Sequence, residues 1–281
     1  MNMSTKKTFP DSILLETLDE ISKQQEKDVN IYLIGGGAMI FYGRKASTKD
    51  IDIVFTESKP LEMFVKAATK AGLKQVESQS RENLNLGAWT VLRAESGIKL
   101  DLFLKKVCNA LTVKESVIDR ARHYLDINSL HIYLMSPEDI VLFKAITERE
   151  SDLDDIRILA ESGIDWNIVE EECLSQENSG AWANLVLDKL RLLKERYGIN
   201  PRLDRLVKHA DRYVLRKSFE SFLGDEELTF IEIQNIVDER VKYSLSWTRS
   251  KLRELEKEGF LTSRKIGRKK KYKIKRVNGE V

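Results

Sequence analysis

The sequence lacks the features that are typical of disulfide-rich secreted proteins, zinc-binding proteins and membrane proteins. Its two cysteines, Cys108 and Cys173, have no CxxC spacing, so we expect neither a disulfide framework nor a zinc site and interpret both as buried thiols. No apolar run approaches the roughly 20 residues that cross a bilayer. The first ten residues are too polar for a signal peptide. We therefore expect a folded cytoplasmic protein that does not associate with membranes.

The charge of the chain is nearly balanced overall but uneven along its length. Lysine and arginine number 47 and aspartate and glutamate 45, and this net charge of +2 gives no global argument for a polyanionic partner. The last segment is nevertheless strongly basic. With 42% apolar and 33% charged residues, the composition is that of a globular, helix-rich protein. A length of 281 residues suggests two or three domains.

The first 135 residues carry a mixture of strand and helix signals. A β-branched run over residues 29–34 precedes three glycines and a second apolar run, which is typical of a strand, a tight turn and a helix. The same reasoning predicts helices over 11–27 and 60–71 and strands over 49–55, 89–96 and 98–105. These elements indicate an α+β fold in which helices flank a mixed sheet.

From Ser136 the apolar period changes from 2 to 3.6, which predicts helices through residue 222. Ser136 as N-cap and Pro137 at the first helical position mark the start of the first of them. The last segment predicts two helices, a turn and two short strands, an order typical of a winged helix. We therefore predict three domains, a sheet domain over 1–135, a helical domain over 136–222 and a winged-helix domain over 223–281.

Two aspartates stand one residue apart in the apolar run "KDIDIVF". Because side chains alternate along a strand, Asp50 and Asp52 point to one face. Two such anions in a partly buried site repel each other unless a cation neutralises them, and oxygen ligands favour Mg²⁺ or Mn²⁺. Asp101, in "GIKLDLFLK", adds a third carboxylate if its strand is a neighbour. Three carboxylates suit a two-metal catalytic centre.

The glycines before this strand indicate a phosphate-binding turn. Gly35 and Gly36 would let the backbone approach a phosphate closely and would direct helix N–H groups at it. Taken alone, a glycine cluster is often only a turn, and an Asp-x-Asp pair is often a solvated strand edge. The combination of strand, glycine turn, paired aspartates and a later single aspartate is more specific. It predicts that the metal binds together with a nucleotide.

At this point the sequence resembles a known family. The segment "LIGGGAMIFYGRKASTKDIDIVF" is similar to the nucleotidyltransferase signature of the DNA polymerase β superfamily. The segments "GGGAM", "STKDIDI" and "SPEDIVLFKAITERESDLDDI" resemble AbiEii-type nucleotidyltransferases, known mainly as toxins of type IV toxin–antitoxin systems. The resemblance covers about residues 31–156. It implies a polymerase-β-type fold and an NTP substrate, with Mg²⁺ or Mn²⁺ bound by the equivalents of Asp50, Asp52 and Asp101.

The resemblance also implies further nucleotide-binding positions. Lys144 matches a lysine near the triphosphate, and Asp152 and Asp155 match an acidic pair on the following helix. Each has an alternative from the residues alone, because Lys144 also suits an ion pair with Glu148 and the two aspartates suit a solvated helix face.

One departure from the superfamily pattern concerns the second glycine. Many members have Gly-Ser, and the serine hydroxyl contacts a phosphate, whereas this chain has Gly36. Phosphate binding would then depend on backbone N–H groups, helped by the side chains of Arg44, Ser47, Thr48 and Lys144. Arg44 fits a solvated surface charge equally well.

Nine basic residues and no acidic residue lie between Arg264 and Arg276, on the expected wing. The candidate nucleic-acid contacts on the preceding helix and the wing are Thr248, Arg249, Lys251, Arg253, Arg268, Lys269, Lys270, Lys271 and Lys273. Duplex DNA is the first candidate partner, and tRNA is the alternative because the same charge holds any polyanion. We interpret Trp247 as a core residue of this domain.

Three functions fit the sequence. The first is an enzyme that transfers NMP from an NTP to an acceptor hydroxyl, on a tRNA 3′ end or a protein, as a component of a toxin–antitoxin pair with an antitoxin partner. The second is a DNA-binding regulator whose nucleotidyltransferase domain senses NTP without turnover. The third is a binding module with structural Ca²⁺ or Mg²⁺. A winged helix also suits a homodimer, although no heptad pattern indicates one.

Overall fold

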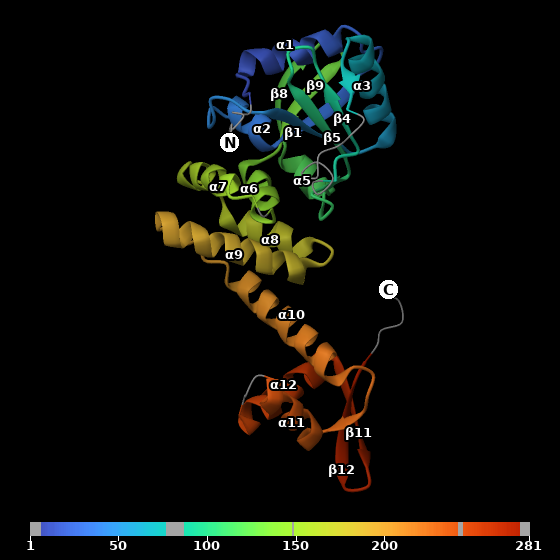
Figure 1. Cartoon of the computed structure of the whole chain (residues 1–281), viewed down its shortest axis with the longest axis vertical. Helices are drawn as coiled ribbons and strands as arrows, with labels where there is room; N and C mark the ends of the chain where they lie inside the picture. Colours follow the sequence, from blue (N-terminus) through green and yellow to red (C-terminus); the bar gives the residue numbers. More distant parts are fainter. Residues whose placement is uncertain (1–6, 77–86, 148, 241–243, 276–281) are drawn as a thin grey trace, which may run out of the picture. The chain divides into compact units, whose positions relative to one another are not determined.

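The computed structural model describes residues 7–76, 87–147, 149–240 and 244–275, and Figure 1 shows the course of the chain. The chain divides into two compact units, residues 1–206 and 207–281. The three domains expected from the sequence remain a prediction. No helix in the described part of the chain has both the length and the apolar character that a membrane span requires.

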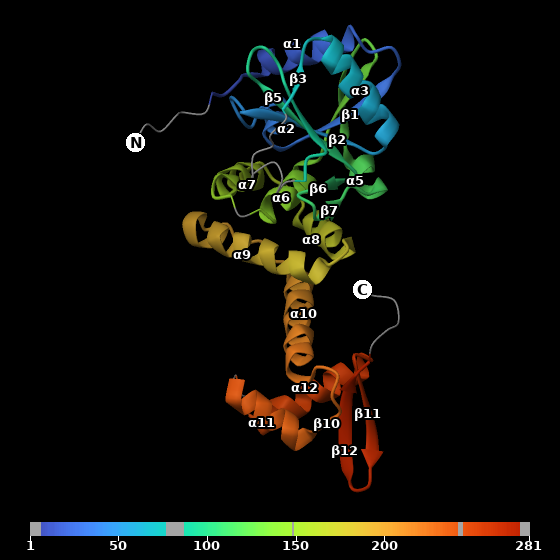
Figure 2. The same cartoon turned by 45° about the vertical axis from the view of Figure 1, so that its right-hand side comes forward.

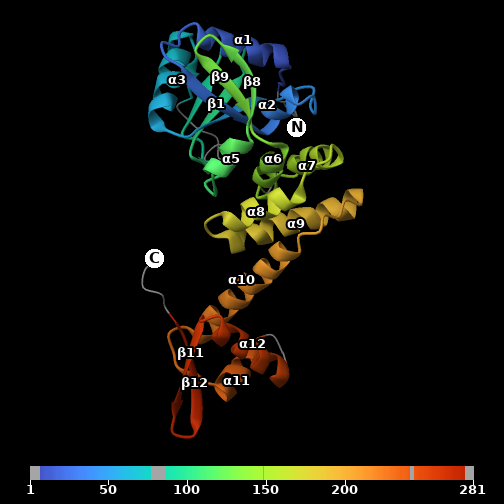
Figure 3. The same cartoon turned by 180° about the vertical axis from the view of Figure 1, so that it is seen from behind.

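A seven-stranded mixed sheet forms the centre of the first unit, in the order β3-β4-β5-β2-β1-β9-β8 (Figures 1 and 3). β2 is parallel to β5 and β1 is parallel to β9, while the other neighbours are antiparallel. The strands are β1 (Val29–Ile34), β2 (Asp50–Phe55), β3 (Lys74–Gln75), β4 (Thr90–Arg93), β5 (Lys99–Leu104), β8 (Arg122–Ile127) and β9 (Leu130–Leu134). The predicted α+β class is confirmed.

Three helices precede or connect these strands, namely α1 (Asp11–Ser22), α2 (Gly35–Phe41) and α3 (Ser58–Lys70). Leu14 and Leu18 of α1 and Phe64 of α3 are fully buried, so both helices contribute to the core. α1 ends five residues earlier than its predicted end. The reason is that its apolar repeat stops at Ile21 and only polar residues follow up to Asp28.

Our sequence reading assigned no elements to residues 106–135, and the structure places five there. They are β6 (Lys106–Val107), β7 (Leu111–Thr112), α5 (Glu115–Arg120), β8 and β9. Leu130, Ile132 and Leu134 alternate into the core, and Asn128 takes the left-handed conformation that the tight turn before them requires, with φ of 50°. This alternation was the signal for the hairpin that joins the sheet beside β1.

Four helices follow the sheet in the first unit. They are α6 (Pro137–Ala145), α7 (Ser151–Glu161), α8 (Trp166–Ser175) and α9 (Ser179–Tyr197). In Figure 2 these helices and α1 lie on opposite sides of the sheet. The predicted cap of α6 is confirmed, because the Ser136 hydroxyl accepts a hydrogen bond from the Asp139 N–H at 3.1 Å. Both faces of α6 are buried, so its charged residues need partners within the protein.

The second unit consists of most of α10 (Asp204–Leu223), followed by β10 (Leu228–Thr229), α11 (Phe230–Arg240), α12 (Leu245–Lys257), β11 (Leu261–Ile266) and β12 (Lys269–Ile274). Its three strands form an antiparallel sheet in the order β10-β12-β11. The core of the unit contains Phe219, Ile233, Leu252 and Tyr272, and Trp247 packs against it. Trp247 itself is only partly buried, and its packing against this core favours the interpretation of Trp247 as a structural residue.

Candidate functional site

The three predicted carboxylates lie on two adjacent parallel strands. Asp50 and Asp52 are on β2, where they alternate with the fully buried Ile51 and Ile53. In the register of β2 with β5, Asp52 is directly opposite Asp101. Directly opposed residues of neighbouring strands point to the same face of a sheet. The pairing therefore brings Asp101 to the face that carries Asp50 and Asp52.

The pKa of Asp52 is affected by the two neighbouring carboxylates. Burial raises the pKa of Asp52 well above its usual range, and the negative charges of Asp50 and Asp101 raise it further. The positive charges of Arg149 and Lys144 act in the opposite direction without cancelling the effect. The positive charges of the protein thus do not fully neutralise the ionised carboxylates. A bound cation would supply the missing positive charge.

The glycine turn is packed directly against this cluster. Gly35 has a φ of 58°, and a Cβ at this position would overlap the Asp52 carboxylate. A Cβ at Gly36 would overlap the hydroxyl of Thr48. Thr48 is fixed by two backbone hydrogen bonds with Phe9, of 2.7 and 2.9 Å. Its hydroxyl therefore occupies the space that a side chain at position 36 would take.

A chain of five alternating charges lies beside the carboxylates. Asp155 accepts hydrogen bonds from Lys45 at 2.9 Å and lies 2.8 Å from the Lys144 ammonium. Lys144 also donates to Asp152 at 2.8 Å, and Asp152 accepts from Arg149 at 2.9 Å. Lys144, Asp152 and Asp155 are all buried. The lysine expected near a triphosphate thus already has two carboxylate partners, and the aspartates expected on a helix face are its partners.

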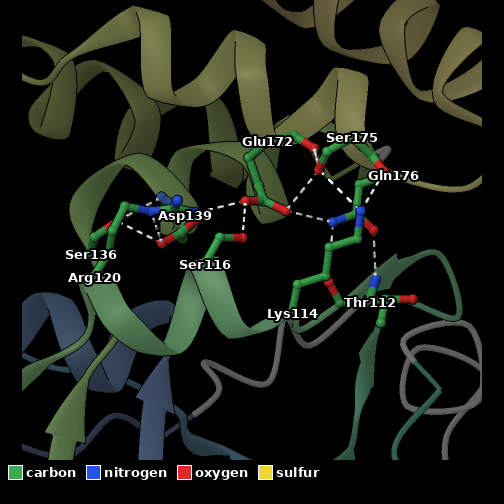
Figure 4. Close-up of polar contacts among 9 residues, drawn as sticks. All are labelled: Thr112, Lys114, Ser116, Arg120, Ser136, Asp139, Glu172, Ser175 and Gln176. Atoms are coloured by element: carbon green, nitrogen blue, oxygen red, sulfur yellow. Dashed lines mark hydrogen bonds and ion pairs between the residues drawn. The ribbon is translucent and has the colours of Figure 1, made fainter.

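A second polar network, shown in Figure 4, connects α5, α6 and α8. Arg120 donates to both oxygens of Asp139, at 2.6 and 3.1 Å, and to Glu172 at 2.8 Å. Ser116 donates to Glu172 at 2.8 Å, and Ser136 donates to Asp139 at 2.7 Å. Both carboxylates are buried, so Arg120 compensates two charges that have lost their water.

The network continues from α8 to β7. The Gln176 side-chain amide donates to the Thr112 carbonyl at 3.1 Å and accepts from the Thr112 N–H at 2.8 Å, as a neighbouring strand would (Figure 4). Lys114 donates to the Ser175 hydroxyl at 3.1 Å. These contacts fix the end of α8 against β7. The start of α6, the helix that carries Lys144 to the site, is held by the contacts of Asp139 with Arg120 and Ser136.

A cavity of about 640 Å³ opens over the carboxylates and is lined by seven basic and five acidic residues. The predicted site residues in its walls are Gly36, Ser47, Thr48, Asp50, Asp52, Asp101, Lys144, Asp152 and Asp155. Gly35 lies next to it, against Asp52. Arg44 is exposed and is not among the lining residues, an arrangement that favours the solvated surface charge. The alternative partner of Lys144, Glu148, lies outside the described residues.

Sequence reasoning missed six basic residues of this cavity, namely Lys7, Lys45, Lys49, Arg93, Lys99 and Arg149. A signal existed for Lys99, because it stands two positions before Asp101 on one strand and must share its face. No comparable local signal existed for Lys45, whose partner Asp155 is 110 positions away.

The carboxylates fit a divalent cation that takes part of its coordination from a substrate. Within residues 7–76, 87–147, 149–240 and 244–275, no group of three His, Cys, Asp or Glu side chains is arranged to hold a metal ion. Mg²⁺ usually binds proteins through one or two carboxylates, with waters and substrate phosphates as further ligands. The adjacent Asp52 and Asp101, with Asp50 on the same face, match that requirement.

The two cysteines contribute no nucleophile. Cys173 is buried as expected, whereas Cys108 is partly exposed. Burial raises the pKa of each thiol to about 12, so both are protonated at neutral pH.

The candidate nucleic-acid residues of the second unit fall into two groups. Thr248 is fully buried beside Leu252 and Leu255, and its hydroxyl donates to the Ser244 carbonyl at 3.4 Å. The i, i+4, i+7 spacing of these three residues was the sequence signal that position 248 faces the core. Thr248 is therefore left out of the candidate surface.

The remaining predicted cations of this unit lie at or near its surface. Arg249 and Arg253 are exposed on α12, while Lys251 forms an ion pair with Glu254 at 2.8 Å. On the hairpin, Lys270 is paired with Glu256 at 2.8 Å and Lys271 is partly buried. The exposed cations at the tip and beyond it are Arg268, Lys269 and Lys273.

One comparison with known proteins gives a match. Residues 14–201 match a protein family described as nucleotidyl transferase of unknown function (DUF2204). The matched region includes the whole seven-stranded sheet, the glycine turn and the three carboxylates. No curated protein matches the chain at a significant level.

Proposed function

We propose, from the premise that the chain belongs to this nucleotidyl transferase family, that it transfers a nucleotidyl group from an NTP to an acceptor hydroxyl. The observation that carries the proposal is the register of β2 with β5, which pairs Asp52 with Asp101 and leaves Asp50 on the same face. The adjoining glycine turn and the cationic cavity give room and charge for a triphosphate.

In the proposed reaction the acceptor oxygen forms a bond to the α-phosphorus of the NTP. The bond from this phosphorus to the oxygen that bridges it to the β-phosphate breaks, and pyrophosphate leaves with the electron pair. Asp101 takes the proton of the acceptor hydroxyl as the general base. Asp50, Asp52 and Asp101 would hold Mg²⁺ or Mn²⁺, which supplies positive charge to the transferred phosphoryl group when bound.

The protein groups around the triphosphate have distinct roles in this proposal. The backbone at Gly36 can approach a phosphate because it has no side chain, and the Thr48 hydroxyl beside it supplies the donor that the glycine lacks. Ser47 lies next to Thr48 in the cavity wall. Lys144 acts together with Asp152 and Asp155 as a buried network that holds this wall of the cavity in position. Lys45 and Arg149 at the two ends of the chain of charges give it more cations than anions.

The test uses the full chain with Mg²⁺, NTPs labelled on the α-phosphate, and total tRNA. Label should transfer with the wild type and not with Asp50→Asn/Asp52→Asn, whereas Asp154→Asn, which changes an aspartate outside the cavity walls, should behave as the wild type. If no protein transfers label but NTP raises the melting temperature, the chain is a nucleotide sensor. If Ca²⁺ or Mg²⁺ stabilises it and nucleotides have no effect, the acidic cluster is a structural metal site.

A specific observation favours a second role for residues 207–281. Two helices followed by a basic antiparallel hairpin are the elements of a winged helix, and exposed cations gather at the hairpin tip. We infer that α12 and this hairpin bind nucleic acid, with duplex DNA as the first candidate and tRNA as the alternative. Band-shift titrations with a DNA duplex and with tRNA distinguish the two.

The resemblance to AbiEii-type proteins supports a proposal for the role of the protein in the cell. The chain would then be the toxin of a toxin–antitoxin pair, with an antitoxin partner, a tRNA 3′ end or a protein hydroxyl as acceptor, and a homodimer as its assembly. Expression should then arrest growth with the wild type and not with Asp52→Asn. Equal growth of the cells that express the wild type and those that express Asp52→Asn would contradict the toxin role, and the proposed enzyme activity would still stand.

A further inference from the structure

The basic residues of the cavity are of two kinds. Lys45, Lys144 and Arg149 are engaged by Asp155 and Asp152 in the alternating chain of charges. The other four, Lys7, Lys49, Arg93 and Lys99, are different, because no carboxylate of the described residues lies within ion-pair distance of any of them. Their charge is therefore available to a ligand of the cavity.

Strand register places two of these cations, Arg93 and Lys99, in one row with Lys74. Lys99 on β5 is directly opposite Asp50 on β2, Arg93 on β4 is directly opposite Lys99, and Lys74 on β3 is directly opposite Arg93. Opposed residues share a face of the sheet. With about 4.8 Å between strands, the row extends roughly 14 Å from Asp50 to the sheet edge.

The opposite charges of Asp50 and Lys99 favour their position on neighbouring strands, but fold stability gives no reason for Arg93 directly opposite Lys99. Like charges directly opposite each other on neighbouring strands are destabilising. A lysine on an edge strand is common because it discourages edge-to-edge association, which is enough to explain Lys74. That reason does not apply to Lys99, which is half-buried on an interior strand. A ligand that carries more than one negative charge accounts for both Lys99 and Arg93.

The row lies on the opposite side of the carboxylates from the glycine turn. β2 is between β1 and β5, and the turn follows β1 whereas the row begins on β5. Asp101, the proposed general base, stands on β5 two residues after Lys99 and so on the same face. An acceptor whose hydroxyl reaches Asp101 therefore extends toward the row, while the triphosphate is on the turn side.

We propose that Lys99 and Arg93 bind backbone phosphates of the acceptor and that the acceptor is the 3′ end of a single-stranded nucleic acid, not a protein side chain. The inference rests on the proposed nucleotidyl transfer for the direction of the acceptor. Lys99 and Arg93 are specificity-determining residues in this account, because they select an acceptor with phosphates next to its terminal hydroxyl.

The test measures binding, so it does not depend on turnover. The probe is a fluorescein-labelled single-stranded RNA 12-mer with a free 3′-hydroxyl, and fluorescence anisotropy is recorded in Mg²⁺ over a range of salt concentrations. All proteins are full chains carrying Arg268→Gln/Lys269→Gln, so that the hairpin contributes less to binding. Arg93→Gln/Lys99→Gln should weaken binding about tenfold and make the slope of log K against log salt about 1.4 less negative, since each single-strand phosphate contact contributes about 0.7.

The matched control is Lys59→Gln/Lys66→Gln, which removes the same charge from exposed positions of α3 outside this cavity and should leave affinity and slope unchanged. Stabilisation by Mg·ATP should be the same in the wild type and in Arg93→Gln/Lys99→Gln. Unchanged RNA affinity in that variant would overturn the proposal, as would loss of ATP stabilisation with RNA affinity retained. Label transfer to protein and not to RNA would also overturn the proposal. If the wild type transfers no label at all, the proposed nucleotidyl transfer is wrong, and the RNA-binding comparison alone then decides whether Lys99 and Arg93 bind nucleic acid.

Discussion

The two units of the molecule differ in where their charged side chains lie, because those of the proposed catalytic site include several buried ones and those of the hairpin are mostly exposed. In the first unit, buried aspartates and basic residues alternate within hydrogen-bonding distance, as in the series from Lys45 to Arg149. In the second unit, cations oppose cations across the hairpin, with Lys265 opposite Lys270 and Arg264 opposite Lys271. The buried, paired charges are fixed in position, and removal of one of them destabilises the protein strongly. The exposed cations of the hairpin act together through the positive potential that they create.

Buried and exposed charges therefore respond differently to substitution. A buried charge that loses its partner destabilises the fold or the site, so its effect is large and specific to one atom. An exposed cation contributes little alone, and its effect depends on salt. Substitutions of buried charges should therefore have larger effects than substitutions of exposed ones.

The largest effect is expected at Asp101. Asp101→Asn removes the proposed general base while keeping the shape of the side chain, and transfer should fall by about 100-fold or more. The free energy of unfolding should not fall, because Asp101→Asn also removes a negative charge that repels the Asp52 carboxylate. Chemical denaturation and steady-state label transfer measure the two quantities. Wild-type transfer in this variant would remove Asp101 from the mechanism.

The next effect concerns stability and the network of Figure 4. Arg120→Ala leaves Asp139 and Glu172 buried without their shared cation, so the free energy of unfolding should fall by about 3 kcal/mol. The control is Arg191→Ala, which breaks a pair with Asp188 on the exposed face of α9 and should cost less than about 0.5 kcal/mol. Equal losses in urea denaturation would mean that the network does not hold the fold together.

The same network predicts a pH dependence. Burial raises the pKa of Glu172, but the hydrogen bonds from Arg120, Ser116 and Gln176 outweigh it, so the net pKa is below the ordinary value of 4.5. A lowered carboxyl pKa stabilises the fold above the ordinary value, and this stability is lost as the pH falls through the lowered one. The stability gap between wild type and Glu172→Gln should therefore be full at pH 7 and shrink below pH 4.5. A gap that grows in acid contradicts the assignment.

A smaller effect is expected where the glycine turn meets Thr48. Gly36→Ser should destabilise the chain by about 1–3 kcal/mol, the usual cost of overpacking, because the new Cβ overlaps the Thr48 hydroxyl. Adding Thr48→Ala should recover most of the loss by removing that oxygen. Melting temperatures of the two single variants and the double variant give the coupling. Additive losses would show that the two positions do not share this space.

The smallest effect per residue is expected on the hairpin. Arg268→Gln/Lys269→Gln should weaken DNA binding and make the salt slope about 1.8 less negative, since each duplex phosphate contact contributes about 0.9. Stability should be unchanged, because both side chains are exposed. Lys194→Gln/Lys208→Gln, which removes the same charge from exposed positions of α9 and α10, is the matched control. An unchanged slope in the double variant would place the DNA on another surface.

Local sequence signals predicted most of the elements outside residues 106–135, but they did not predict which distant segments pair with each other. Ser136 and Pro137 start α6 as expected, because capping and a fixed proline φ act within a few residues. The alternation in "KDIDIVF" likewise placed Asp50 and Asp52 on one face. Which strand lies beside β2, and in which register, depends on the packing of the whole sheet.

The charge partners of the site illustrate the same limit. Lys45 and Asp155 meet across 110 positions, and no periodicity marks such a pair. Lys144 was expected to contact phosphate, but the structure gives it two buried aspartates, which only the contact between α6 and α7 supplies. Thr248 shows the opposite case, because its spacing to Leu252 already indicated the core.

The most direct test of the central claim is a crystal structure of the chain with Mg²⁺ and a non-hydrolysable NTP. Our account predicts an ion bound by Asp50 and Asp52, with Asp101 at the same ion or at the acceptor position. It also predicts that the triphosphate contacts the backbone of Gly36 and the hydroxyl of Thr48. A nucleotide bound away from β2 and β5, with no ion at these aspartates, would contradict it.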